Sequence, residues 1–372
     1  MKQLFFIVSL SIVFSQTECD EDRYLNEIFN VNLISNVEYG ENTNETIFGS
    51  PYTEVLYMNI YEPAGDTQEE RPLVFFLHGG SFVGGSKTNS DIVELCESYA
   101  KRGYVAVSID YRLTLSLIFQ GTEENAYRAV MKAIHDLKAA IRYMNKDYQE
   151  NNLYRIDPER VYVGGISAGS IASVNAAYLN QESEIPDFIY DEVMSIGGLE
   201  GESGNPGYGS NIYGVINLCG AVGDYLWLEE NDLPVVSMHG DADDTVPYDD
   251  QLITLFGLNI QVYGSYIIHN TMLDLGNYSD LYTYVGGGHC PFSNMNLVLD
   301  FTSDFMYDVV CQDEGLFGDI NGDGLLNVLD IVFAINIILD IEEYDENADL
   351  NDDSVVDILD IVLLVNLILS GE

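Results

Sequence analysis

Short apolar runs alternate with longer helical patterns through most of the chain. Seven runs between about residues 37 and 310 predict β-strands, namely 54–61, 73–77, 105–109, 161–164, 215–218, 235–238 and 281–285. Residues 123–148 carry apolar side chains every three or four positions, the spacing of one face of an amphipathic helix. Strands separated by helices predict a mostly parallel sheet that is covered on both faces.

A segment without apolar periodicity interrupts this alternation at residues 197–214. It is rich in Gly, Ser and Asn, a composition typical of loops. Loops of this length are uncommon in compact domains and often serve a function. We therefore expect a long loop here, and one hypothesis is that it lies at the rim of a functional site.

The pattern changes after Cys311. Two stretches from residue 312 onward match each other at an offset of 30 residues, the first reading GDINGDGLLNVLDIVFAINIIL and the second ADLNDDSVVDILDIVLLVNLIL. An internal repeat of this kind marks a separate small module. We therefore expect a large α/β domain at residues 16–311 and a small all-α module at residues 312–372.

The first 15 residues have the three-part pattern of a secretory signal peptide. Met1 and Lys2 form a short positive region, an apolar run follows at residues 4–14, and polar residues come next. The apolar run is too short to span a bilayer. We therefore expect residues 1–15 to be removed, and a secreted mature chain to begin at Gln16.

Charge and composition argue against membranes and nucleic acids as partners. Lys and Arg number 14 and Asp and Glu number 61, which gives a formal net charge of −47. Nucleic-acid binding relies on basic residues that neutralise phosphates, and anionic membrane surfaces repel acidic chains. Cys19 raises the alternative of lipidation, but Glu18 precedes it where a small residue would be expected. No other stretch predicts a transmembrane helix.

The chain has five cysteines, at positions 19, 96, 219, 290 and 311. Secretion permits disulfides. Cys219 lies in an apolar run and is expected to be a buried free thiol. Of the three possible pairings of the other four, we favour Cys290 with Cys311 and Cys19 with Cys96.

Residues 165–169 form a G-x-S-x-G sequence with Ser167 at its centre. In a chain with 33 glycines the motif alone is weak evidence. A turn at Asp157 and Pro158 and a strand precede it, and a helical pattern follows at residues 170–179. A strand–turn–helix unit exposes a serine hydroxyl on a sharp elbow. We therefore expect Ser167 to be a nucleophile rather than an idle serine in a glycine-rich connection.

A serine hydroxyl needs a base to take its proton. If the order along the chain is serine, acid, histidine, the base is His269 or His289. His289 follows a predicted strand and three glycines, on a loop of the kind at which open α/β sheets place their sites. His269 lies in an apolar stretch and is more typical of a packed or surface histidine. We favour His289.

The imidazole in turn needs an acid that fixes its tautomer. The segment after strand 235–238 supplies Asp241, Asp243 and Asp244. Spacing to the following Val-Pro favours Asp243, whereas Asp241 and Asp244 are expected to cap the next helix or to face solvent. The alternative is that all three belong to an acidic surface.

A tetrahedral oxyanion needs preorganised N–H donors. The sequence HGGSF at residues 78–82 follows strand 73–77, and its glycines allow the backbone to approach a substrate carbonyl. We expect the amides of Gly79, Gly80 and Ala168 to form an oxyanion hole. His78 is expected to be structural, because it precedes the elbow and no acid is spaced for it.

Five motifs in this order resemble the α/β-hydrolase superfamily, particularly its carboxylesterase and lipase-like members. They are HGGSF (78–82), DYR (110–112), IDPERVYVGGISAG (156–169), HGDADDTVP (239–247) and GGGH (286–289). The resemblance spans about residues 37–310. It implies an eight-stranded, mostly parallel sheet and hydrolysis through an acyl-enzyme, in which Ser167 attacks, His289 transfers the proton and Asp243 orients His289.

Oxygen ligands recur at calcium-loop spacing in both copies of the C-terminal repeat. They occupy positions 1, 3, 5, 9 and 12, with a main-chain carbonyl at position 7. In the first copy they are Asp319, Asn321, Asp323, Leu325, Asn327 and Asp330, and in the second they are Asp349, Asn351, Asp353, Val355, Asp357 and Asp360. Each loop leads into an apolar helix. We expect structural calcium here rather than a merely acidic tail, and no cofactor for catalysis.

Two such loop–helix units resemble the dockerin module, which binds cohesin domains of scaffold proteins. The resemblance covers about 60 residues and implies a cohesin-like partner. Ser354 replaces the turn glycine of the second loop, so that site is expected to be weaker. Apolar pairs at 328–329 and 358–359 stand where many dockerins carry polar recognition residues.

These features together predict a secreted serine carboxylic-ester hydrolase with a calcium-stabilised docking tail. By association, the tail favours polymer substrates such as acetyl or feruloyl esters of polysaccharides, or polyesters. One alternative is a serine peptidase of the same fold, although no propeller-like repeats precede the hydrolase pattern. Another is a non-catalytic scaffold or adhesion subunit, although Ser167, Asp243 and His289 are all present.

Overall fold

The computed structural model describes residue 19, residues 22–312 and parts of the C-terminal repeat. In the repeat the described residues are 318, 320–321, 326–339, 341, 348–351 and 355–370. The predicted signal peptide (1–15) lies outside the described residues.

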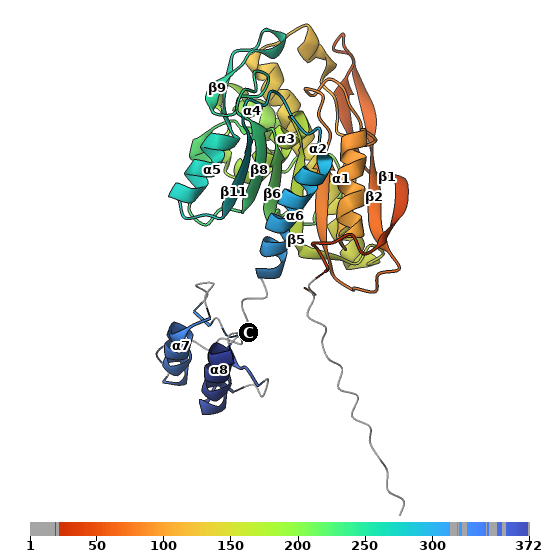
Figure 1. The fold of residues 1–372 in the computed structure, drawn as a ribbon. Helices are drawn as coiled ribbons and strands as arrows, with labels where there is room; N and C mark the ends of the chain where they lie inside the picture. Colours follow the sequence, from red (N-terminus) through yellow and green to blue (C-terminus); the bar gives the residue numbers. More distant parts are fainter. Residues whose placement is uncertain are drawn as a thin grey trace, which may run out of the picture.

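An eight-stranded sheet forms the centre of the large domain (Figure 1). Its strands in chain order are β1 (Asn30–Glu45), β2 (Pro51–Ala64), β3 (Arg71–Leu77), β4 (Val105–Ile109), β5 (Ile156–Ile166), β6 (Gly214–Leu218), β8 (Val235–Gly240) and β11 (Ser279–Tyr284). Their order in space is β1-β2-β4-β3-β5-β6-β8-β11. Strand β2 is antiparallel to both neighbours, and all pairs from β4 to β11 are parallel. This arrangement confirms the predicted α/β-hydrolase fold.

Helices cover both faces of this sheet, and each face has its own apolar core. The helices are α1 (Ser90–Lys101), α2 (Glu123–Glu150), α3 (Ala168–Tyr178), α4 (Asp187–Ser195), α5 (Ser265–Asp274) and α6 (Met295–Gln312). Helices α2, α3 and α5 contribute to one core, and α1 and α6 to the other. Apolar burial on both faces explains why the central strands are apolar throughout.

A small second sheet adjoins the large one. It consists of β7 (Ala221–Val222), β10 (Ile260–Gly264) and β9 (Asp250–Ile253), which pair in antiparallel fashion. Short 3₁₀ helices are η1 (Leu115–Ile118), η2 (Glu182–Glu184), η3 (Tyr225–Trp227) and η4 (Leu255–Gly257). This sheet and η4 lie next to the carboxyl edge of the large sheet and help to enclose the cavity described below.

The cysteine pairing differs from the prediction. Disulfides join Cys19 to Cys311 and Cys219 to Cys290, and Cys96 is a buried free thiol. The predicted pairs Cys19 with Cys96 and Cys290 with Cys311 are therefore wrong, as is a free Cys219. The apolar run around Cys219 correctly indicated burial, but the fold brings this residue to the loop after β11.

The long loop at residues 197–214 exists, but it packs on α2 rather than at the rim of the site. The ring of His135 in α2 contacts the carbonyl of Gly198 at 2.8 Å, and the guanidinium of Arg142 donates to the carbonyl of Gly204 at 3.0 Å. The turn expected at Asp157 and Pro158 also differs, since both residues lie within β5 at a register irregularity.

Two further helices form the described part of the C-terminal repeat. They are α7 (Val328–Ile338) and α8 (Ile358–Ser370), and they share an apolar core with Ile320 and Ala348. The expected calcium ligands Asp330 and Asp360 lie in the first turn of these helices and are fully buried.

Candidate active site

Ser167 sits on a strained turn between β5 and α3. Its backbone angles are φ 55° and ψ −116°, a conformation that non-glycine residues rarely adopt. Gly169 permits the turn to approach β3, because a Cβ at this position would lie 2.1 Å from the carbonyl oxygen of Leu77. The amide of Ser167 donates to the carbonyl of Leu218 in β6 at 3.0 Å. The turn therefore holds the hydroxyl at the carboxyl edge of the sheet.

His289 lies on the loop after β11 and points at this serine. Its Nε2 is 2.9 Å from the Oγ of Ser167, and its Nδ1 is 2.7 Å from the Oδ2 of Asp243. The His289 side chain is 27% exposed, whereas that of Asp243 is fully buried. The imidazole is therefore accessible from solvent on one side and fixed by a buried carboxylate on the other.

Asp243 follows β8 and accepts four hydrogen bonds. Two come from the rings of His289 and His239, and two come from the amides of Thr245 and Val246. Burial acts to raise the pKa of Asp243. The hydrogen bonds from His239, His289 and Thr245 outweigh that effect and hold the pKa well below its usual range. The carboxylate is therefore ionised throughout the neutral and mildly acidic range.

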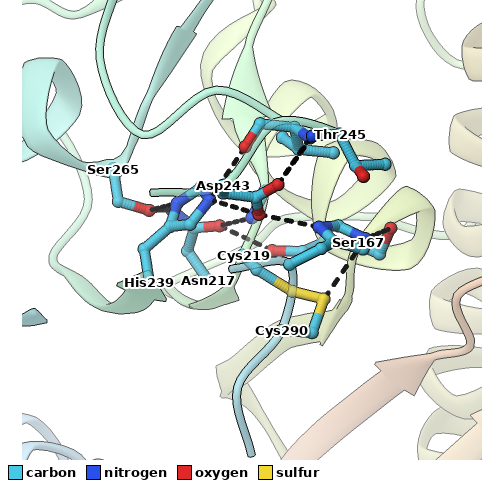
Figure 2. The surroundings of a disulfide bond; sticks show 12 residues. Ser167, Asn217, Cys219, His239, Asp243, Thr245, Ser265 and Cys290 are labelled. Carbon is cyan, nitrogen blue, oxygen red and sulfur yellow. Dashed lines mark hydrogen bonds and ion pairs between the residues drawn. A yellow bond between two sulfur atoms is a disulfide. The ribbon is translucent and has the colours of Figure 1, made fainter. Parts of the chain in front are cut away.

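A buried polar network that the sequence pattern did not predict lies behind the acid (Figure 2). The Nδ1 of His239 is 2.8 Å from the Oγ of Ser265, and Asn217 donates to the same oxygen at 3.0 Å. Ser170, in α3, donates to the Oδ1 of Asn217 at 2.6 Å. The one sequence feature that could have indicated this network is the position of His239 at the start of the HGDADDTVP motif, four residues before Asp243.

The other histidines and acids near the site have other partners. His269 lies in α5 and contacts the hydroxyl of Ser279 at 3.0 Å. Asp241 accepts the amide of Gly286 at 2.6 Å and thereby ties the turn after β8 to the His289 loop. Asp244 is exposed. The element after this segment is strand β9, so neither acid caps a helix.

Of the proposed oxyanion donors, Gly79 and Ala168 lie next to the serine. A Cβ at Gly79 would lie 3.5 Å from that of Ser167, so the main chain at Gly79 runs close to the serine. The carbonyl of Gly80 accepts the amides of Val83 and Gly84, which folds the chain into a tight turn. Ala168 begins α3, and the first amides of a helix have no acceptor within it.

His78 supports this turn from behind. Its ring stacks on Tyr111 at 4.3 Å between centroids, and its Nδ1 lies 2.8 Å from the carbonyl oxygen of Gly79. Burial lowers the pKa of His78. These contacts fit the structural role predicted for His78.

An apolar cavity opens beside Ser167 and Ala168. It extends from η1 and α2 across α3 to the small sheet and η4. Its apolar lining includes Phe82, Leu117, Tyr127, Val130, Met131, Ile171, Leu179, Trp227, Val246, Ile253, Leu255, Phe256, Leu258, Ile260 and Val262. A cavity of this composition favours an apolar group of a ligand.

The expected calcium ligands fall partly outside the described residues. Asp319, Asp323, Leu325 and Asp353 lie outside them. Among the others, the two position-12 acids have matching contacts. Asp330 accepts the amides of Ile320, Asn321 and Asn327, and Asp360 accepts those of Asn351 and Asp357. The described parts of the two loops thus share these contacts, and Asp and Asn oxygens at these positions fit a hard cation.

Comparisons with known proteins support a two-part chain. Residues 58–220 match the family described as BD-FAE, and residues 317–369 match the Dockerin type I domain. The first match includes Ser167, Gly79 and Gly80 and ends before Asp243 and His289. Among the described residues, no helix is both long and apolar enough to cross a membrane.

Curated relatives align with about a third of this chain. The medium-chain fatty acyl-CoA hydrolase precursor of Anas platyrhynchos is 33% identical over 129 residues, which are 34% of this chain and 21% of that protein. Pyrethroid hydrolase Ces2a of Mus musculus is 30% identical over 132 residues, 35% of this chain and 22% of that protein. The chain thus spans about a fifth of the length of these relatives.

Solved structures extend the likeness over most of the hydrolase domain. Esterase 2 of Thermogutta terrifontis with bound propionate has a TM-score of 0.52 and 20% identity, covering 73% of this chain and 95% of that chain. The match to the same esterase phosphorylated by paraoxon covers 78% of this chain and 98% of that chain, again with a TM-score of 0.52 and 20% identity. At this identity the likeness shows the fold. With the family matches, it confirms the predicted resemblance, an esterase-like α/β-hydrolase domain followed by a dockerin type I domain.

Proposed function

We propose that this chain is a secreted serine esterase that hydrolyses carboxylic esters through an acyl-enzyme. The observation that carries the proposal is the unbroken hydrogen-bonded chain from the hydroxyl of Ser167 through His289 to Asp243. The acid is buried and ionised, the base is held between two partners, and the nucleophile stands on a strained elbow. The hydrolase names of the curated relatives reported above and the esterase names of the solved structures support the same reaction class.

The residues act in two half-reactions. His289 Nε2 takes the proton of Ser167 as its Oγ attacks the ester carbonyl, and the amides of Gly79, Gly80 and Ala168 hold the oxyanion. As the intermediate collapses, the C–O bond to the alcohol breaks and His289 donates the proton to the leaving oxygen. Water then attacks the acyl-enzyme with His289 again as base, which releases the acid and restores Ser167.

The apolar cavity supports an acyl group larger than acetate. It lies against Ser167 and Ala168, where the acyl-enzyme would form. Each buried methylene contributes about 0.8 kcal/mol, which corresponds to about a fourfold gain in kcat/KM. Among the substrates considered above, aromatic or longer aliphatic acyl esters of a polymer fit this cavity better than acetyl esters.

The C-terminal module supports a docking role. Its calcium loops would order the two helices, with carboxylate oxygens from residues such as Asp330 and Asp360 and amide oxygens from Asn327 and Asn351. The apolar side chains at positions 10 and 11 of each loop, Val328, Leu329, Ile358 and Leu359, are 54–66% exposed. We propose a cohesin-like partner on a scaffold protein whose contact surface is itself apolar.

The direct test is ester hydrolysis by wild type and by Ser167→Ala. Wild type should hydrolyse p-nitrophenyl acetate, butyrate and hexanoate, with kcat/KM rising about fourfold per methylene. Ser167→Ala should abolish all three activities while the circular dichroism spectrum and thermal unfolding stay unchanged. Ser195→Ala, at the exposed end of α4, is the matched control and should retain full activity.

Other outcomes would select another function. Full activity in Ser167→Ala would remove this serine from the mechanism. Cleavage of peptide anilides but not of esters would favour the serine peptidase, and a folded wild type without either activity would favour the non-catalytic subunit.

A further inference from the structure

A disulfide lies directly beside the proposed catalytic atoms (Figure 2). Cys219 follows β6, and Cys290 follows His289 in the sequence. The Sγ of Cys290 is 3.4 Å from the Nε2 of His289, the same nitrogen that faces the hydroxyl of Ser167. The second disulfide, between Cys19 and Cys311, instead joins the N-terminal segment to the end of α6.

The crosslink connects the anchor of the nucleophile to the base. The carbonyl of Leu218 accepts the amide of Ser167, and Leu218 precedes Cys219. A covalent path therefore runs from Leu218 through Cys219 and Cys290 to His289. The distance between the serine and the imidazole is thus constrained by the disulfide as well as by Asp243.

The loop that carries His289 is intrinsically free to move. Three consecutive glycines precede the histidine, and glycine has the greatest backbone freedom of all residues. Hydrogen bonds of 2.6 and 2.9 Å still tie Gly286 and Gly287 to the turn after β8. Beyond them, the disulfide and the contact between His289 and Asp243 attach the loop to the sheet.

The backbone at both cysteines is in the left-handed region. The φ angles are 53° at Cys219 and 45° at Cys290, where residues with a Cβ are strained. Such conformations persist when the surrounding structure imposes them. The crosslink is one of the contacts that hold the two residues, together with the hydrogen bond from the amide of Cys219 to the carbonyl of Met238. We expect loss of the crosslink to let both residues relax and His289 shift with its neighbour.

We propose that the Cys219–Cys290 disulfide is a positioning element of the active site, and that its reduction lowers turnover by releasing His289 from Ser167. This inference rests on the esterase function proposed above. A free thiol at Cys290 adds a second effect, because it can donate a hydrogen bond to the imidazole nitrogen that must accept the proton of Ser167.

Reduction requires an external thiol. A dithiol such as dithiothreitol attacks one sulfur through its thiolate, forms a mixed disulfide and then closes to its own cyclic disulfide. The protein S–S bond breaks, and two electrons and two protons produce the thiols of Cys219 and Cys290. Reoxidation reverses the exchange and should restore the site.

The first experiment compares two double variants, C219A/C290A and C19A/C311A, with wild type. C219A/C290A should lose on the order of 10²-fold in kcat, the cost of about 1 Å of misplacement, with KM for p-nitrophenyl butyrate nearly unchanged. Its pH–rate profile should also change, because the base is no longer held at one distance from the nucleophile. C19A/C311A should unfold at a lower temperature but keep the wild-type kcat and profile.

The second experiment reduces the C19A/C311A variant. Of the two disulfides in the described residues, this variant keeps the one between Cys219 and Cys290. Dithiothreitol should lower kcat and reoxidation should restore it, which also covers the case in which C219A/C290A fails to fold. Retention of wild-type kcat and pH profile after verified reduction would overturn the proposal.

A phosphonate probe separates this proposal from the proposed function. Fluorophosphonate labelling reports the competence of Ser167 and His289 without a choice of ester. Wild type that is not labelled would refute the serine hydrolase function itself. Equal labelling rates for oxidised and reduced protein would refute only the positioning role of the disulfide.

Discussion

Asp243 accepts hydrogen bonds from two histidines and two main-chain amides, although orienting His289 requires only one of these contacts. His239 and His289 approach the same carboxylate oxygen, at 3.1 and 2.7 Å. His239 is completely buried and is itself held by Ser265, so its ring is fixed before any substrate binds. His239 therefore stabilises the charge and the position of Asp243, while His289 remains available for the proton transfer proposed above.

This arrangement predicts unequal effects of substitutions around one carboxylate. Asp243→Asn should lower kcat by about 10⁴-fold, because an amide no longer stabilises the imidazolium or enforces its tautomer. His239→Gln should cause a smaller loss, since Asp243 keeps its contact with His289 and two amides. Both are measured as kcat for a short p-nitrophenyl ester, with circular dichroism to check folding.

Asp244→Asn is the matched control, because it makes the same change of charge one residue away on an exposed side chain. It should leave kcat unchanged. A loss in Asp244→Asn equal to that in Asp243→Asn would show that the general acidity of this segment matters rather than one oriented carboxylate.

At the scale of elements, apolar periodicity predicted most of the sheet. Strand β4 has the predicted bounds, and α2 begins at the predicted residue because the side chain of Thr122 caps it by accepting the amide of Asn125. Strand β1 was missed because its sequence, NVNLISNVEYGENTNE, is polar and largely exposed along an edge of the sheet. An edge strand can form through backbone pairing without an apolar signal.

Contacts between distant elements could not be predicted from the sequence. Ser167, Asp243 and His289 could be selected because each follows a strand, and parallel strands end at one edge of a sheet. The disulfide joins the ends of β6 and β11, which flank β8 in the sheet, and this spatial order is not visible in the spacing of cysteines. The network of Asn217 and Ser265 was missed for the same reason.

The loop on α2 makes a histidine sensitive to pH. His135 belongs to α2, and its side chain is buried under the loop at residues 197–214. A Cβ at Gly201 in this loop would lie 2.2 Å from the His135 ring. Burial lowers the pKa of His135 to about 4, although the contact with the carbonyl of Gly198 acts in the opposite direction. An unfolded histidine has a pKa of about 6.5, so between pH 6.5 and 4 the unfolded state binds more protons and stability falls as pH falls.

His135→Gln should remove this part of the acid sensitivity. Glutamine can still donate to the carbonyl of Gly198 but does not titrate. The free energy of unfolding of wild type should fall by about 3 kcal/mol more than that of His135→Gln between pH 7 and 4, measured in urea at constant salt. His269→Gln is the control, because the ring of His269 is less buried. This substitution should have a smaller effect on the fall in the free energy of unfolding between pH 7 and 4. Parallel pH dependences for wild type and His135→Gln would contradict the assignment.

At the scale of the whole molecule, charge is distributed unevenly along the chain. The last basic residue is Arg160, and no Lys or Arg occurs between residues 161 and 372. The described Lys and Arg ion pairs of the hydrolase domain, such as Arg112 with Asp136, use basic residues from the first part of the chain. The C-terminal repeat therefore has no basic side chains of its own, and cations from solution must offset its charge.

This imbalance predicts two independent unfolding transitions in the full chain. A ligand that binds only the folded state stabilises it by about 2.7 kcal/mol at a concentration 100-fold above its Kd. Calorimetry should therefore show a transition that moves to lower temperature when EDTA removes calcium, and a second transition of the hydrolase domain that does not move. Asp330→Asn and Asp360→Asn should each weaken the calcium response, while hydrolysis of p-nitrophenyl butyrate stays unchanged with or without EDTA. If EDTA moved neither transition, the calcium loops would be refuted, and if it abolished hydrolysis, the separation of the two functions along the chain would be wrong.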